Sequence, residues 1–127
     1  METLHITYIQ YHINWEQKHA NFKKLEKLLE KETGTDLIVL PEMFATGFSM
    51  NASALAENEP GETLHWMQNM AIKLDSALCG SVIAHNNDKY YNRLYWVFPD
   101  GHFKTYDKHH LFSLAHEENT YTAGHKQ

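Results

Sequence analysis

Apolar and polar positions follow two different periods along the first third of the chain. Residues 4–11 are apolar and β-prone, which predicts a first strand. Residues 15–29 then carry apolar side chains at helical spacing, with lysines and glutamates between them, at Trp15, Phe22, Leu25, Leu28 and Leu29. We expect Asn14 to cap this helix with Gln17 as its capping-box partner, and Gly34 to end it.

A second strand and a long loop are predicted next. Residues 36–40 are apolar throughout after Asp36, which is typical of a strand buried on both faces. A strand, a helix and a strand in this order favour parallel pairing with a right-handed crossover. Glycine, asparagine and proline in residues 41–60 argue against regular structure, so we expect a loop there. This loop starts at the carboxyl end of a buried strand, where α/β sheets place their ligands.

The rest of the pattern predicts one more helix and further strands. Apolar positions at helical spacing predict a helix over residues 64–74. Residues 78–84, 90–98 and 102–106 predict three strands, and residues 99–101 form a hairpin turn between the last two. The predicted fold class is therefore α/β with a mixed sheet, in one domain or a piece of one.

Composition excludes several classes of protein. Of the 127 residues, 43% are hydrophobic and 21% are charged, and the formal net charge is -5. A mildly acidic chain with scattered lysines is not expected to bind nucleic acid. The longest apolar runs are about five residues, whereas a membrane span needs roughly 20. The N-terminus shows no signal-peptide pattern, so we expect no membrane association and a cytoplasmic location.

Two polar residues follow predicted strands and are candidates for catalysis. Glu42 comes directly after the apolar run and Pro41, where we expect it to be poorly solvated, a setting that suits general acid and base work. Lys108 follows the strand after the hairpin turn, and a charged lysine near a carboxylate can stabilise an oxyanion. The plain alternatives are a solvated loop glutamate and an exposed surface lysine.

The segments around these two residues resemble motifs of one enzyme family, the nitrilase superfamily. Residues 40–44, Leu-Pro-Glu-Met-Phe, are similar to its glutamate motif, and residues 106–112 are similar to its lysine motif. Residues 91–93, Tyr-Asn-Arg, resemble the strand that precedes that lysine. The motifs occur in the family's order, and the resemblance covers essentially the whole chain. It implies that this chain is the N-terminal half of a four-layer α-β-β-α sandwich.

Two segments are similar to the omega-amidase branch of that superfamily, namely residues 41–50 and 116–124. Counting back from Gly124, Glu117 matches a second active-site glutamate of many members, although Glu118 is its neighbour. The branch hydrolyses the terminal amide of small carboxylates, for example 2-oxoglutaramate to 2-oxoglutarate and ammonia. The resemblance implies a cysteine thioester mechanism, in which Glu42 is the base and Lys108 stabilises the oxyanion. It implies no metal or organic cofactor.

The family places its nucleophilic cysteine after the segment that finishes this chain. We therefore expect residues 1–127 to be a partial carbon-nitrogen hydrolase domain, truncated before that cysteine and inactive alone. The single cysteine, Cys79, lies inside a predicted strand ahead of the lysine and is expected to be a small buried hydrophobe. The alternative is a non-catalytic half domain that self-associates or binds a partner. Exposed apolar sheet surface favours a homo-oligomer.

Other features are candidates of lower rank. Phe44 and Phe48 are candidates to wall a substrate pocket, although an apolar plug in the loop is an equal alternative. The ten histidines show no zinc-binding spacing. His109 and His110 are adjacent on a segment expected to be extended, so their side chains should point in opposite directions. We therefore expect no metal site.

Overall fold

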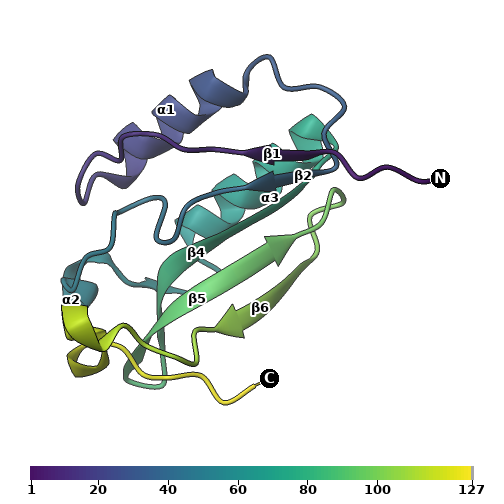
Figure 1. Cartoon of the computed structure of the whole chain (residues 1–127). Coiled ribbons are helices and arrows are strands. Elements are labelled where there is room, and N and C mark those ends of the chain that lie inside the picture. Colours follow the sequence, from purple (N-terminus) through teal and green to yellow (C-terminus); the bar gives the residue numbers. More distant parts are fainter. Residues whose placement is uncertain (127) are drawn as a thin grey trace.

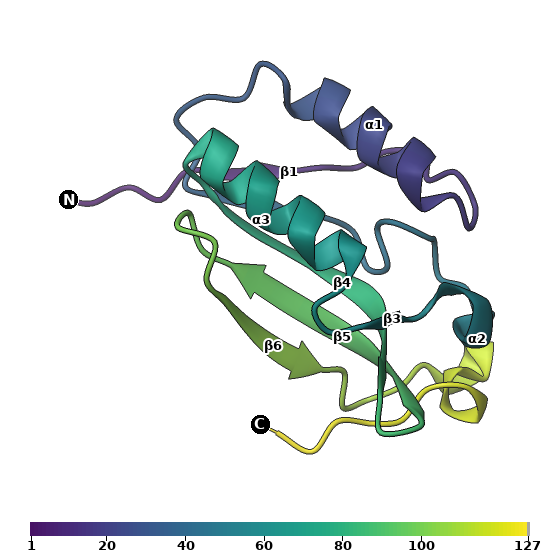
Figure 2. The same ribbon diagram turned by 180° about the vertical axis from the view of Figure 1, so that it is seen from behind.

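One mixed β-sheet with its two long helices on the same side forms the frame of the protein (Figures 1 and 2). The computed structural model describes residues 1–126. The helices are α1 (Lys18–Leu29), α2 (Ala52–Leu55) and α3 (Glu62–Leu74), and two short 3-10 turns are η1 (Ser113–Ala115) and η2 (Glu117–Asn119). The strands are β1 (Ile6–Tyr8), β2 (Leu37–Val39), β3 (Glu57–Asn58), β4 (Ala77–Asn86), β5 (Lys89–Val97) and β6 (Phe103–Asp107).

The sheet has the order β1-β2-β4-β5-β6, with β3 paired to β4. Strands β1, β2 and β4 run parallel, whereas β4 pairs with β5 and β5 with β6 in antiparallel fashion. The predicted α/β class, the mixed sheet and the parallel pairing of the first two strands are confirmed. Within residues 1–126, no helix is long and apolar enough to cross a bilayer.

The core lies between the sheet and the two long helices. Phe22 of α1 stacks on Trp66 of α3, with ring centroids 5.1 Å apart. Below this pair, Ile38 of β2 and Leu78 of β4 are fully buried against the helices. The apolar side of each long helix therefore packs against the side chains of one face of the sheet. This contact buries the apolar surfaces of the helices and of the sheet together.

Within residues 1–126, the opposite face of the sheet is free of helices. Side chains alternate along a strand, so residues paired with one another share a face. The pairings place these apolar residues on the helix-free face: Ile6, Tyr8, Val39, Cys79, Leu94, Trp96 and Tyr106. Tyr8 is 76% exposed and Ile6 is 45% exposed. This face, which we call the open face, also carries the candidate catalytic residues.

The start of α1 differs from the prediction. Gln17, not Asn14, is the N-cap residue, and its own side chain makes no capping hydrogen bond. Asn21 explains the difference: its Oδ1 accepts a hydrogen bond from the Asn14 backbone N–H, and its Nδ2 donates to the Asn14 carbonyl, both at 2.8 Å. The segment before the helix is thereby held in a turn, and the helix begins only at Lys18. It also ends at Leu29, well ahead of Gly34.

The predicted loop over residues 41–60 contains short regular elements. Helix α2 and strand β3 both lie inside it, so the prediction of an irregular segment is wrong in part. Glu57 of β3 accepts hydrogen bonds from the backbone N–H and the hydroxyl of Thr63, at 2.7 and 2.5 Å. Strand β3 thus holds the start of α3 through a side chain that periodicity does not detect.

Candidate active site

Glu42 stands in a tight turn that follows β2. The turn is fixed to β4, because the Leu40 N–H donates to the Cys79 carbonyl and the Met43 N–H donates to Ser81 Oγ, both at 2.8 Å. Met43 has a positive φ of 47°, which reverses the chain at this point. The Glu42 side chain is 48% exposed, so the expectation of poor solvation is wrong. It projects over the open face, where the helices do not cover it.

Lys108 reaches the same place from the end of β6. It alternates with Asp107, so it shares the open face with Tyr106. Its Nζ donates to Glu42 Oε1 at 2.8 Å and to Glu117 Oε2 at 3.0 Å, and the side chain is only 27% exposed. Partial burial alone would lower the pKa of Lys108, but the hydrogen bonds and charges of the two carboxylates outweigh it and raise that pKa. Lys108 is therefore a charged, partly buried group between two carboxylates.

Glu117 differs from its neighbour Glu118 in burial. Glu117 lies in η2 with 0% exposure, whereas Glu118 is exposed. Besides Lys108, the backbone N–H of Phe112 donates to Glu117 Oε2 at 2.7 Å. A buried carboxylate is stable only with such donors around it. Of the two glutamates that the sequence left open, the structure brings Glu117 to Lys108.

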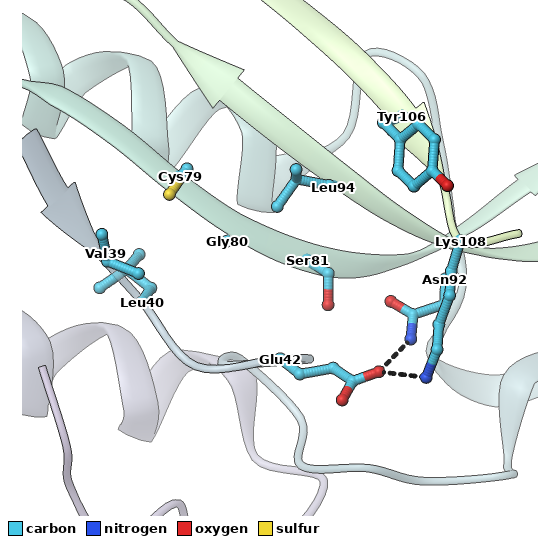
Figure 3. A pocket seen from close by; sticks show the side chains of 10 residues that line it. All are labelled: Val39, Leu40, Glu42, Cys79, Gly80, Ser81, Asn92, Leu94, Tyr106 and Lys108. Atoms are coloured by element: carbon cyan, nitrogen blue, oxygen red, sulfur yellow. Dashed lines mark hydrogen bonds and ion pairs between the residues drawn. The ribbon is translucent and has the colours of Figure 1, made fainter. Parts of the chain in front are cut away.

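Asn92 completes the cluster, although the sequence motifs alone did not mark it as a residue of the site. It lies in β5, is 2% exposed, and its Nδ2 donates to Glu42 Oε1 at 2.7 Å and to Glu117 Oε1 at 3.2 Å (Figure 3). Glu42, Lys108, Glu117 and Asn92 therefore form a closed ring of hydrogen bonds. Its place inside a predicted strand could have indicated such a role, because an asparagine buried in a strand needs polar partners for its side-chain amide.

A cavity of about 300 Å³ opens beside this ring on the open face. Its apolar end is lined by Val39, Cys79 and Leu94, and its polar end by Glu42, Asn92 and Lys108 (Figure 3). An apolar cavity with a few convergent polar groups is the usual form of a small-molecule site. The polar groups stand together at one end, so a ligand would meet the ring with one end only.

Cys79 lies at the apolar end of this cavity, on the interior of β4. It is partly exposed, not buried as expected, because no helix formed by the described residues lies over the open face. Desolvation raises the pKa of the Cys79 thiol. A thiol with a raised pKa stays protonated at neutral pH, and the thiolate is the nucleophilic form. Cys79 is therefore poorly suited to attack a carbonyl group.

The two phenylalanines proposed as pocket walls lie in different places. Phe44 is fully buried in the core, with its ring centroid 5.8 Å from that of Trp66, and it does not line the cavity. Its ring points to the helix side because it packs close to Gly80. Phe48 lies at the site instead: its ring centroid is 5.4 Å from Lys108 Nζ, a cation–π distance.

Arg93 and Gly124 support the backbone that carries Lys108. The Arg93 guanidinium binds Asp107 through two hydrogen bonds, of 2.7 and 3.0 Å, on the opposite face from Lys108. Gly124 N–H donates to the Lys108 carbonyl at 3.0 Å. A Cβ atom on Gly124 would stand 2.2 Å from the Asp107 carbonyl oxygen, so only glycine fits there. The position of Lys108 is thus fixed by contacts on both sides of Asp107.

The adjacent histidines do not point in opposite directions. The rings of His109 and His110 meet edge to face with centroids 4.6 Å apart. His109 Nδ1 donates to the Gly124 carbonyl at 2.6 Å, which draws its ring back toward the C-terminal segment. Among residues 1–126, no group of three or more His, Cys, Asp or Glu side chains is placed to hold a metal ion.

Known proteins match this chain along nearly its whole length. The family model described as Carbon-nitrogen hydrolase matches residues 5–126. Omega-amidase YafV of Yersinia enterocolitica is 41% identical over 124 residues, which are 98% of this chain and 48% of that protein. The 2-oxoglutaramate amidase of Bacillus subtilis is 33% identical over 123 residues, which are 94% of this chain and 48% of that protein.

Solved structures share the fold. A CN-hydrolase superfamily protein from Xanthomonas campestris, which has an arsenic adduct in its active site, superposes with a TM-score of 0.94 at 38% identity, over 99% of this chain and 48% of that one. Nit3 of Saccharomyces cerevisiae, a member of the nitrilase superfamily, gives 0.84 at 26% identity, over 97% and 49%. The chain spans about half the length of the curated relatives it matches. It belongs to the carbon-nitrogen hydrolase family, in the omega-amidase branch of the nitrilase superfamily.

Proposed function

We propose that these residues form the glutamate and lysine part of an amide-hydrolysing site of the omega-amidase type. Its substrate is the terminal amide of a small carboxylate such as 2-oxoglutaramate. One observation carries the proposal: Lys108 Nζ lies within hydrogen-bond distance of both Glu42 and Glu117, at the polar end of a cavity of about 300 Å³. The names of the Yersinia and Bacillus relatives support this substrate class.

The proposed mechanism begins with a cysteine thiol that these 127 residues do not supply, because Cys79 is poorly suited to the role. Glu42 takes the thiol proton as sulfur attacks the carbonyl carbon. Lys108 stabilises the oxyanion of the tetrahedral intermediate. Collapse of that intermediate breaks the carbon–nitrogen bond, and Glu42 gives its proton to the leaving ammonia. Water, deprotonated by Glu42, then hydrolyses the thioester, and the proton returns to the sulfur.

The two carboxylates take different parts in this scheme. Glu42 Oε1 accepts from both Lys108 and Asn92, whereas Oε2 makes no hydrogen bond within residues 1–126 and belongs to a 48% exposed side chain. Oε2 is therefore the atom that exchanges protons. Both oxygens of the fully buried Glu117 are occupied by donors, so it orients Lys108 and does not exchange protons.

The first prediction concerns turnover. We expect no ammonia release from 2-oxoglutaramate by the 127-residue chain alone, and turnover once the chain is joined to the second half of the Yersinia omega-amidase. In this joined protein, Glu42→Gln and Lys108→Ala should each lower kcat/KM by about a hundredfold or more, since removing a proton carrier or an oxyanion donor has costs of this order. Coupled ammonia detection measures both.

The matched control for this experiment is Glu118→Gln, which changes an exposed carboxylate beside the buried one. It should leave kcat/KM unchanged. Circular dichroism would verify that each variant is folded. Robust turnover by the chain alone would contradict the assignment of the nucleophile, and a joined protein whose turnover survives both substitutions would contradict the roles of Glu42 and Lys108.

A non-catalytic half domain that self-associates is the alternative function. The observation that favours it is the open face, where Tyr8 is 76% and Ile6 45% exposed although both lie in a sheet strand. Apolar side chains on such a face mark surfaces that bind another protein. Under this alternative the ring around Lys108 is retained without turnover, so activity of the joined protein distinguishes the two functions.

A further inference from the structure

The Asn92 side chain has an orientation that its two acidic neighbours dictate. Ionised carboxylates accept hydrogen bonds and do not donate them. Glu42 Oε1 lies 2.7 Å and Glu117 Oε1 lies 3.2 Å from the same end of the Asn92 amide. A carbonyl oxygen at that end would face two negative oxygens, so the NH2 group must occupy it. The carbonyl oxygen Oδ1 is thereby turned the other way.

Oδ1 consequently faces the cavity without a partner. Figure 3 shows the Asn92 carbonyl on the side away from Glu42 and Lys108, among the residues that line the cavity. Oδ1 makes no hydrogen bond within residues 1–126, and none of the buried side-chain oxygens there lacks a partner, so Oδ1 is open to the cavity although the residue as a whole is only 2% exposed. An acceptor that opens only onto a cavity is satisfied there by water or by a ligand that carries a donor.

The position of Oδ1 relative to Glu42 indicates which ligand group fits. The leaving nitrogen of the substrate must come close to Glu42, which supplies its proton in the proposed mechanism. The same Asn92 amide that donates to Glu42 therefore presents an acceptor next to that nitrogen. A primary amide carries two N–H donors, and using one of them on Oδ1 would leave the nitrogen lone pair free to take a proton from Glu42.

We propose that Asn92 Oδ1 accepts a hydrogen bond from the substrate's amide nitrogen and thereby selects primary amides over esters and acids of the same shape. This inference rests on the proposed function, whose site it shares. The carboxylate product has no N–H to offer and is repelled by Oδ1, which favours its release. Asn92 is then a substrate-binding residue as well as part of the ring that fixes Glu42 and Glu117.

The kinetic test compares an amide with an ester. The proteins compared are the joined protein, in which the second half of the Yersinia omega-amidase follows this chain, and its Asn92→Leu variant. For each protein, kcat/KM is measured with 2-oxoglutaramate and with the 5-methyl ester of 2-oxoglutarate. If Oδ1 binds the amide nitrogen, the amide-to-ester ratio of kcat/KM falls by roughly tenfold in the variant, because the ester never used this contact. If Asn92 only positions the glutamates, both substrates lose equally and the unchanged ratio overturns the inference.

Leu94→Ala is the matched control, since Leu94 is the next residue of β5 on the same face and lines the same cavity without a hydrogen-bonding group. It should leave the amide-to-ester ratio unchanged even if it slows both reactions. An equal fall of the ratio in Leu94→Ala would overturn the inference, because packing would then explain the selectivity.

A second measurement uses the 127-residue chain itself and needs no turnover. The Asn92 side-chain carbon Cγ is assigned by NMR from its absence in Asn92→Leu, and the chain is titrated with the amide and with the ester. We expect the Cγ resonance to shift with the amide only. Equal shifts with both ligands, or none with either, overturn the inference. If the joined protein hydrolyses neither substrate, the proposed function fails, and this titration alone decides the role of Asn92.

Discussion

One ammonium group in this site is shared by two carboxylates that differ in their contact with solvent. Glu42 is 48% exposed and keeps one oxygen free, whereas Glu117 is fully buried and has donors on both oxygens. Burial of Glu117 is stable because Lys108, Asn92 and the Phe112 N–H all donate to it. In the proposed mechanism, the mobile proton and the fixed charge are therefore divided between two residues of the same type.

At the residue scale, Glu117→Gln should lower the pKa of Lys108, because it removes one of the two negative charges that raise this pKa. We expect the free energy of unfolding to fall as well, by about 1–3 kcal/mol, since the buried donors lose a charged acceptor. NMR titration of the Lys108 side chain and urea unfolding measure the two effects. Glu118→Gln, which is exposed, is the control and should change neither.

The pH dependence of this contribution has a definite sign. A lysine whose pKa is raised by folding stabilises the protein fully below its unfolded pKa, about 10.4, and loses that contribution as the pH rises through the folded pKa. The unsubstituted chain should thus lose stability above about pH 10.4 more steeply than Glu117→Gln. Equal slopes would show that Glu117 does not act on Lys108.

Sequence motifs identified Glu42 and Lys108, but they could not give the environment of either. The exposure of Glu42 depends on the open face above β2, which no local pattern records. The choice between Glu117 and Glu118 depends on the rotation of a single 3-10 turn. The motif around Asn92 showed only a family resemblance. Its role could not be predicted, because its partners, Glu42 and Glu117, are far from it in the sequence.

At the element scale, the pairing of β5 with β6 determines where Lys108 stands. Arg93 and Asp107 are directly opposite each other in the two strands, and the side chain of Arg93 is 10% exposed. The hydrogen bond to Asp107 and the charges around it outweigh desolvation and raise the pKa of Arg93. Arg93 also binds Glu59, which follows β3, so one side chain connects β5 and β6 to the segment after β3.

We predict that Arg93→Met lowers the free energy of unfolding by about 3 kcal/mol, because Asp107, 23% exposed, would lose its charged partner in a poorly solvated place. Lys104→Met is the control, since it removes a positive charge from an exposed position of β6, the strand that contains Asp107. It should change the stability by less than about 0.5 kcal/mol. Guanidinium unfolding followed by tryptophan fluorescence distinguishes the two, and equal losses would contradict the role of Arg93.

The elements themselves were predictable where apolar periodicity is strong. The apolar spacing of Phe22, Leu25 and Leu29 marks α1, and the hairpin turn marks the junction of β5 and β6. Their boundaries were less predictable, because side chains from distant positions set them. Asn21 ties Asn14 into a turn ahead of α1, and Glu57 of β3 caps α3 through Thr63. Both contacts form only when the chain is folded, so a local sequence pattern does not reveal them.

At the scale of the whole molecule, helices cover one side of the sheet (Figure 2), and within residues 1–126 the other side has no helix over it (Figure 1). The open face combines exposed Ile6, Tyr8 and Tyr106 with the candidate site. Burial of apolar surface yields about 25 cal/mol for each Å², so a second protein surface against this face would be stabilising. We propose that the chain associates with itself through the open face.

Association of this kind predicts a mass above 14.8 kDa that rises with concentration in sedimentation equilibrium. Tyr8→Lys should lower the association constant, because it places a charge on the open face. Leu28→Lys is the control: Leu28 is 49% exposed but lies on α1, on the covered side of the sheet. A single mass of one chain at all concentrations, or an equal effect of the two variants, would contradict the proposal.

Gly124 has a consequence for how variation along this chain is interpreted. The hydrogen atom in place of a side chain lets the C-terminal segment pass against Asp107, and any other residue would push that segment off the strand. In a saturation-mutagenesis map, position 124 would therefore be as intolerant as positions 42 and 108, although it carries no chemistry. Variant interpretation based on intolerance alone would mistake this spacer for a member of the catalytic machinery.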